Sequence, residues 1–166
     1  MNHMITKEQY IKSLVREMDI IKHLAGKIDA SKLDYRPTPG QRSTLELIQY
    51  MGRFMTIGIE GNIAGDQNVY IELSKAPNPT TFENFVEQLD AQIKFIQETV
   101  GALAEEDFQK ESTVFGSTNT LGMHLLGNLK TATAYKMQLF LYIKQSGNDT
   151  IGTSNVWGGM DPVVQA

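Results

Sequence analysis

The sequence contains no cysteine among its 166 residues. This absence excludes disulfide bonds, thiolate metal ligands and a cysteine nucleophile, and it is typical of a protein kept in a reducing cytoplasm. Histidine is also scarce, with three residues, and tryptophan occurs once. A metal site that needs several imidazole ligands therefore has few residues to draw on.

The chain also lacks an excess of positive charge and a long apolar run. Its formal net charge is -4, so electrostatic binding to nucleic acid phosphates is not expected. No apolar stretch approaches the length of a membrane span, and the opening MNHMITKEQY is unlike a secretory signal. We therefore expect a cytoplasmic protein with no nucleic-acid or membrane partner. Residues 1–166 fit a single domain with one core.

Apolar residues recur at three- and four-residue steps in four long segments, which predicts four helices. The expected ranges are about 6–29, 43–64, 80–104 and 118–146. Three of them begin with a capping-box pair, namely Thr6 with Gln9, Ser43 with Glu46 and Thr80 with Glu83. No segment has the pattern of a convincing strand. The sequence therefore predicts an all-α four-helix bundle.

Two segments between or after these helices are expected to be irregular. Residues 66–79 form a long loop, a kind of connection that is often functional or mobile, and IELS within it is too short for a strand. Residues 147–166 are rich in glycine and polar side chains, which predicts a non-helical tail anchored by Trp157.

The fourth helix carries a row of uncharged polar residues on one face. The row comprises His124, Asn128, Thr131, Tyr135, Gln138 and Tyr142. Lys130, Lys136 and Lys144 fall elsewhere and mark the solvated side, so the row is expected to face the bundle interior. Polar groups there need partners, which a hydrogen-bonded network, a partly solvated seam or a ligand can supply. The structural network is the commoner case in bundles.

Three large apolar residues, Leu126, Met137 and Phe140, lie on the lysine side of the same helix. They give this side more apolar surface than a solvated face needs, which predicts a homodimer formed through the helix. The alternative is that the N-terminal residues or the tail cover them.

Two stretches resemble a known family. YRPTPGQRSTLELIQYMG is similar to the junction that opens the second helix of DinB/YfiT-like four-helix-bundle proteins, and TAYKMQLFLYIKQSG is similar to their last helix. Helix order, loop placement and chain length agree over nearly the whole chain. The resemblance implies an up-down-down-up bundle and a nickel or zinc ion held by three histidines. Some similar proteins are thiol-dependent transferases or isomerases, so the resemblance implies that activity too.

The sequence departs from the family at all three positions where the resemblance implies a metal ligand. These positions hold Tyr50, Thr131 and Tyr135. Neutral hydroxyls are poor ligands for nickel or zinc, and a tyrosinate is costly to form because the tyrosine pKa lies near 10. We therefore expect no metal cofactor, unless unforeseen ligands hold such an ion.

The three histidines of the chain do not replace the missing ligands. His3 is expected in a frayed terminus, and His23 lies near the end of the first helix, where it suits a helix-dipole contact. His124 lies on the polar row about two turns before Thr131. With Glu46 or Asn128 it could form a weak metal site or an acid–base pair, and a hydrogen-bonded structural histidine is the commoner alternative.

Three functions are compatible with these observations. The first is a small-ligand-binding or scaffold protein with a degenerate metal site. Its pocket candidates are Tyr50, Thr131, Tyr135, His124, Asn128, Gln138, Arg42 and Glu46, with Arg42 available to an anionic ligand. The second is a thiol-dependent transferase or isomerase without the usual metal, in which Tyr50 or Tyr135 donates a proton and His124 acts as base. The third is a structural dimer with a hydrogen-bonded tyrosine seam.

Overall fold

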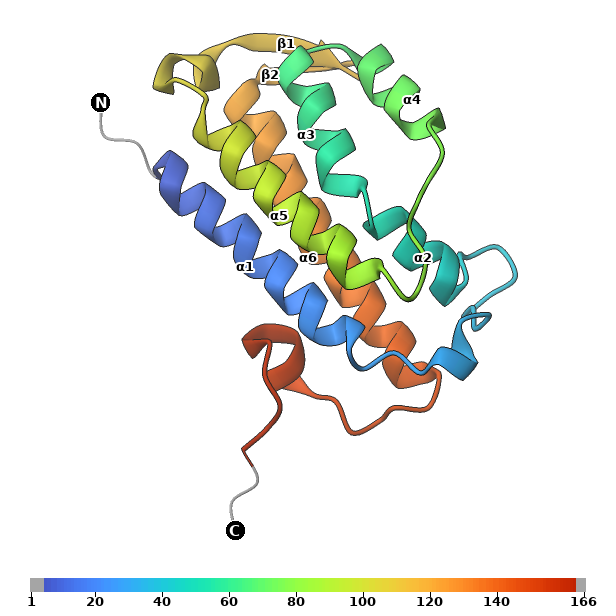
Figure 1. Ribbon diagram of the computed structural model, residues 1–166. Helices are drawn as coiled ribbons and strands as arrows, with labels where there is room; N and C mark the ends of the chain where they lie inside the picture. The colour runs from blue at the N-terminus through green and yellow to red at the C-terminus, as the bar shows by residue number, and fades with distance from the viewer. Residues whose placement is uncertain (1–4, 164–166) are drawn as a thin grey trace.

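The computed structural model describes residues 5–163 and shows a bundle of long helices. The bundle is built from α1 (Lys7–Ala25), α2 (Thr44–Met51) continued by α3 (Phe54–Ala64), α5 (Phe85–Gly101) and α6 (Leu121–Gln145). In Figure 1, α1 and α6 run one way along the bundle, and α2–α3 and α5 run the other way. The all-α, up-down-down-up architecture expected from the sequence is therefore confirmed.

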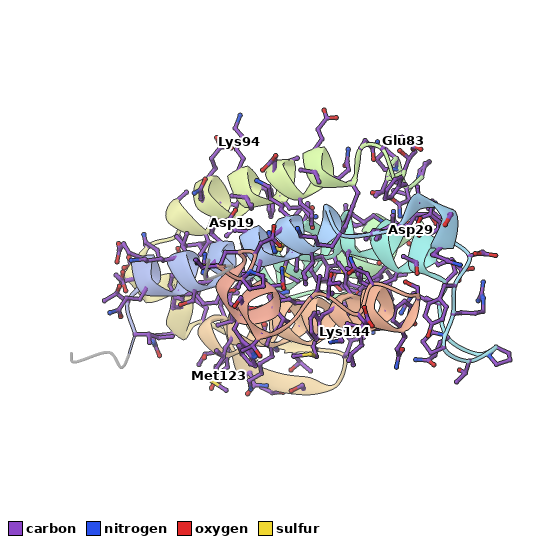
Figure 2. All side chains as sticks on the ribbon, turned by 90° about the horizontal axis from the view of Figure 1, so that it is seen from below. Asp19, Asp29, Glu83, Lys94, Met123 and Lys144 are labelled. Carbon is purple, nitrogen blue, oxygen red and sulfur yellow. The ribbon has the colours of Figure 1, made fainter. Side chains whose placement is uncertain are left out.

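The bundle closes around one core that all the long helices share. Its fully buried residues include Leu14, Met18, Ile21, Leu47, Met51, Met55, Leu89, Ile96, Leu125 and Leu139. Figure 2 shows Lys94 pointing outward from α5, whereas Met123 lies at the opposite edge of the molecule. Within residues 5–163, no helix has the length and apolar character needed to cross a membrane.

Two of the three expected capping boxes begin helices as predicted. The Thr6 hydroxyl accepts from the Gln9 backbone N–H at 3.2 Å, and the Ser43 hydroxyl accepts from Glu46 at the same distance. In both pairs the side chain of the later residue bonds back to the first. Because these bonds satisfy backbone donors that have no intrahelical partner, they fix where α1 and α2 start.

The third expected capping box, Thr80 with Glu83, is wrong. The reciprocal pair is Thr81 with Asn84, and α5 begins only at Phe85. Thr80 is instead buried against Gly52, where a Cβ atom would lie 2.1 Å from the Thr80 hydroxyl oxygen. The chain passes so close to Gly52 that only glycine fits there.

The second predicted helix, 43–64, is interrupted at Gly52 and Arg53 and forms α2 and α3. Gln92 of α5 supplies the hydrogen bonds that this break removes. Its amide nitrogen donates to the Met51 carbonyl at 3.0 Å, and its amide oxygen accepts from the Met55 N–H at 2.9 Å. Gln92 is only 2% exposed, so the interruption is a buried and fully bonded feature of the bundle.

The segment expected to be a loop, 66–79, contains the helix α4 (Gln67–Lys75). Asp66 caps it by accepting from the Asn68 N–H at 2.8 Å. None of its residues is fully buried, and it packs on α3, where the absence of a side chain on Gly61 makes room for Tyr70. The loop assignment was wrong because this helix is short and lies outside the core.

A small hairpin that the sequence analysis missed precedes α6. Strand β1 (Glu111–Val114) pairs antiparallel with β2 (Ser117–Thr120), with Glu111 opposite Thr120. The last helix therefore begins at Leu121 and not at 118. Short 3₁₀ turns occur at Ala30–Lys32 and Glu105–Gln109. Figure 1 shows the hairpin and α4 at the same end of the bundle.

The tail contains one π-helical turn, Ser154–Gly158, which packs on α1. Trp157 is 60% exposed, so the prediction that it alone anchors the tail is wrong. Asn155 is the buried anchor: its amide nitrogen contacts His23 Nε2 at 3.0 Å and donates to Asp161 at 2.9 Å. His23 thus holds the tail, while His3 lies outside the described residues.

Candidate functional site

Lys136 of α6 is buried, although the sequence pattern placed it on the solvated side of the helix; that prediction is wrong. It is fully buried, at 0% exposed, and its Nζ lies 2.8 Å from a Glu17 carboxylate oxygen on α1. The Trp157 ring covers the ammonium group at 4.8 Å. The tail turn, which was expected to be irregular, closes this side of the helix. Lys130 is exposed as predicted, and Lys144 donates to the Ile151 carbonyl at 3.0 Å.

The first half of the polar row is hydrogen-bonded within the chain. His124 Nε2 lies 3.2 Å from the Ser112 carbonyl of the hairpin. Asn128 is buried and accepts from the Asn62 amide at 2.8 Å. The Thr131 hydroxyl donates back to the Gly127 carbonyl of its own helix at 3.0 Å. These three members of the row therefore already have partners.

The last two members of the row hold the entry to α2. Gln138 donates to the Tyr142 hydroxyl at 3.2 Å, and that hydroxyl donates to the Arg42 carbonyl at 3.0 Å. The ring of Tyr142 is buried. This chain of bonds fixes the backbone of Arg42 against α6, so most of the polar row is a structural network.

Tyr135 differs from the rest of the row because its neighbours are aromatic. Its ring centroid lies 4.7 Å from that of Tyr50 on α2 and 5.9 Å from that of Phe54 on α3. Tyr50 and Phe54 also meet edge to face at 5.9 Å. Three helices thus build one aromatic contact from residues that are half-buried or buried, in a geometry that favours aromatic pairs.

Tyr70 of α4 brings a third phenol near Tyr50. Burial raises the pKa of the Tyr50 hydroxyl, and the nearby phenol groups of Tyr70 and Tyr135 raise it further. We call Tyr50, Tyr70 and Tyr135 the phenol cluster. A phenol with its ordinary pKa near 10 is already protonated at neutral pH, and the raised pKa keeps Tyr50 so at higher pH, where it is a hydrogen-bond donor and not a base. The hairpin residue Phe115 supports Tyr70 edge to face at 5.2 Å.

Arg42 lies beside the phenol cluster. Its guanidinium carbon is 4.6 Å from the Tyr50 ring centroid, which is a cation–π arrangement. Its neighbour Arg36 pairs with Glu46 at 3.3 Å, whereas Arg42 forms no ion pair with the residues that the structure describes. The Arg42 charge therefore remains available at the edge of the cluster.

The suggested pairing of His124 with Glu46 is wrong. Glu46 accepts from the Ser43 backbone and pairs with Arg36 at the start of α2, close to the end of α6 where Tyr142 lies. His124 is eighteen residues before Tyr142, about 27 Å along the helix axis. These two side chains lie near opposite ends of the bundle.

The structure thus brings together three of the predicted pocket residues: Tyr50, Tyr135 and Arg42. Sequence reasoning missed Tyr70 and Phe54, which complete the aromatic contact. The signal for Tyr70 was the run NVYIELSK, whose apolar residues recur at helical steps after the capping residue Asp66. Three hollows of the surface, of about 730, 280 and 340 Å³, lie elsewhere, and none of them is lined by Tyr50, Tyr70 or Tyr135.

Comparison with solved structures defines the class of fold. A DinB-like protein from Bacillus subtilis, YjoA, aligns with a TM-score of 0.71 at 17% identity, over 87% of this chain and 96% of that one. A DinB-like protein from Bacillus cereus gives 0.69 at 13% identity, over 88% and 96%. A protein assigned to the DinB family from Exiguobacterium sibiricum gives 0.65 at 21% identity, over 88% and 97%.

These likenesses confirm that the chain has the DinB-like fold predicted from its sequence. No family model matches the sequence, and no curated protein matches it. The fold places Tyr50 on α2 and Thr131 and Tyr135 on α6, as the resemblance implied. Tyr50 and Tyr135 are in contact, whereas the Thr131 hydroxyl is bonded to its own helix.

Proposed function

We propose that the protein binds a small organic molecule at the phenol cluster and does so without a metal ion. The observation that carries this proposal is the contact of Tyr50 on α2 with Tyr135 on α6, beside Phe54 of α3. Tyr50 and Tyr135 occupy two of the three positions where the family resemblance implies a metal ligand. The other members of the polar row form hydrogen bonds within the chain. Tyr50 and Tyr135 instead contact each other and the ring of Phe54.

The phenol cluster does not fit a nickel or zinc ion. Such ions bind neutral imidazole, thiolate or carboxylate, and a phenol must lose its proton before it can compete with them. The raised pKa of Tyr50 opposes that loss. Among residues 5–163 no three histidine, aspartate or glutamate side chains gather in a way that could hold a metal ion.

The test compares hydroxyl removal inside and outside the cluster. Ligand-observed NMR with a library of small aromatic and aliphatic molecules should yield binders that the Tyr50→Phe and Tyr135→Phe variants lose. Tyr35→Phe is the matched control, because its hydroxyl bonds Gln145 on the surface. Binders that survive both cluster substitutions would contradict the proposal. Metal analysis of protein purified without a metal-affinity column should find no stoichiometric nickel or zinc.

An enzyme of the thiol-transferase kind gains no specific support from this arrangement. The base suggested for it, His124, is bonded to the Ser112 carbonyl near the far end of α6 from Arg42. The phenols can donate a proton or a hydrogen bond, but they supply no positive charge to lower the pKa of a thiol. Ligand binding is therefore the function that the geometry supports best.

Dimerisation through the outer face of α6 is a separate proposal. Leu126, Met137 and Phe140 are half-buried within their own chain, but Met123 and Leu141 are exposed on this helix. No packing contact within the chain requires a glycine at position 127, because a Cβ atom there would meet nothing within 4 Å. Light scattering after size exclusion should show a dimer that a Met123→Glu, Leu141→Glu variant shifts to monomer.

A further inference from the structure

The phenol cluster and Arg42 form a group of hydrogen-bond donors with no carboxylate among them. The ordinary phenol pKa near 10 already keeps Tyr50 protonated at neutral pH, and burial and the neighbouring phenols raise that pKa further. The guanidinium of Arg42 carries only donors and is always charged. The helix that supplies Tyr135, α6, contains no aspartate or glutamate between Leu121 and Gln145. A ligand that pairs with the Arg42 guanidinium must therefore bring acceptors, to which the phenol hydroxyls can also donate.

Arg42 differs from its neighbour Arg36 in a way that points to a ligand. Arg36 is neutralised by Glu46 at 3.3 Å and also donates to the Gln41 carbonyl at 2.8 Å. The Arg42 side chain has no such ion pair with the described residues and lies over the Tyr50 ring at 4.6 Å. The guanidinium therefore lies at the edge of the aromatic contact, where its donors have no ion-pair partner among the described residues.

The protein also fixes the backbone that carries Arg42. The buried Tyr142 hydroxyl donates to the Arg42 carbonyl, and Gln138 donates to that hydroxyl. Two members of the polar row thus set the position of a residue that lies outside the helix. The fixed backbone and the Tyr50 ring together restrict the motion of the guanidinium. Less conformational entropy is therefore lost when a ligand binds it.

We propose that the ligand of the phenol cluster is an anion, a small molecule whose carboxylate or phosphate group is bound by Arg42 while its remainder contacts Tyr50 and Tyr135. Arg42 and the phenols all donate to the anionic group, and the aromatic rings pack against its apolar part. This inference rests on the proposed binding site and adds the chemical class of its ligand. Because the chain as a whole carries a net charge of -4, an arginine without an ion pair among the described residues is a local feature and not part of a general positive charge.

The experiment titrates the intact protein with benzoate, with benzamide as its neutral isostere, and with inorganic phosphate. Backbone amide shifts of Arg42, Tyr50 and Tyr135 are followed by NMR at constant ionic strength. Benzoate should bind more tightly than benzamide, and added sodium chloride should weaken its binding. Arg42→Gln should lower benzoate affinity by about tenfold, because a hydrogen bond to a charged group is lost.

Two further variants make the result specific. Arg42→Lys retains the charge and should recover part of the affinity, whereas Lys130→Gln removes an exposed charge elsewhere on α6 and should change nothing. Equal binding of benzoate and benzamide, insensitive to Arg42→Gln, would overturn the anion inference and leave the binding site intact. Anion shifts that map away from all three residues, or no shift with either anion, would overturn it as well. Loss of neutral binders in Tyr50→Phe is the separate test of the site itself.

Discussion

Tyr135 and Lys136 are neighbours in α6, yet they face two regions that handle polar groups differently. Lys136 is enclosed between α1 and the tail, where Glu17 pairs with it and Trp157 covers it. Tyr135 faces α2 and α3, where its neighbours are Tyr50 and Phe54. On the first side, polar groups are paired with partners within the chain. On the second, Arg42 has no ion pair with the described residues and the phenols meet aromatic rings, which separates an enclosed, paired region from the one that we propose for binding.

The largest effect is expected from breaking the buried ion pair. Glu17→Ala leaves the Lys136 ammonium buried without its carboxylate, which should lower the free energy of unfolding by about 3 kcal/mol. Urea unfolding can be followed through Trp157, the only tryptophan. Glu8→Ala is the control, because Glu8 is an exposed residue of the same helix.

A double variant sharpens the meaning of this loss. Glu17→Met combined with Lys136→Met replaces the ion pair by apolar side chains of similar size and should regain most of the lost stability. If Glu17→Ala alone costs no more than Glu8→Ala, Lys136 finds water or another partner, and the enclosed region depends less on this ion pair than its geometry indicates.

Removal of the Gln92 amide tests a second buried polar group. Gln92→Leu leaves the Met51 carbonyl and the Met55 N–H without the bonds that bridge the helix break. The expected loss is about 2 kcal/mol, because each buried unpaired group costs about 1–3 kcal/mol and the leucine regains some packing. Chemical denaturation measures it, with the exposed Gln97→Leu on the same helix as control. An unchanged stability would mean that α2 and α3 can join into one helix.

Removal of the Tyr50 or Tyr135 hydroxyl should affect ligand binding and leave stability nearly unchanged. Tyr135→Phe and Tyr50→Phe retain the aromatic contact and remove only hydroxyls, so each should change the free energy of unfolding by less than about 1 kcal/mol. Both should lose ligand binding. Tyr10→Phe provides the contrast, because its buried hydroxyl donates to the Leu125 carbonyl at 2.7 Å. A cluster variant that is destabilised more than Tyr10→Phe would favour the structural tyrosine seam over the binding site.

The fold was predictable from the sequence because apolar periodicity and capping pairs report on long helices. Short elements were not, since α4 and the hairpin depend on contacts with distant residues, such as the fit of Tyr70 over Gly61. The direction of the polar row was correct in general, but Lys136 was placed on the wrong side. Nothing in the local pattern of α6 shows that Glu17 and the tail turn will enclose that lysine.

The candidate site was predictable in part for the same reason. Tyr50 and Tyr135 could be found because the resemblance assigns a role to their positions. Tyr70 belongs to a helix expected to be a loop, so its approach to the cluster depends on tertiary structure. The hydroxyl of Thr131 was expected in the pocket, but a bond to the Gly127 carbonyl four residues earlier satisfies it.

The smallest effect is expected at alkaline pH, where the phenol cluster should cost stability. The pKa of Tyr50 is raised from 10.0 in the folded protein, chiefly by burial and then by Tyr70 and Tyr135. Stability is therefore retained below pH 10 and lost as the pH rises above that value, because the unfolded chain releases its proton first. Tyr50→Phe should reduce this alkaline loss, measured by urea unfolding between pH 9 and pH 11 as an approximate window around the ordinary tyrosine pKa.

Tyr35→Phe, whose hydroxyl lies on the surface, should leave the loss unchanged. Equal slopes in the wild type and Tyr50→Phe would show that Tyr50 is not enclosed by its neighbours, and the contrast with the Lys136 side would then rest on Tyr135 alone.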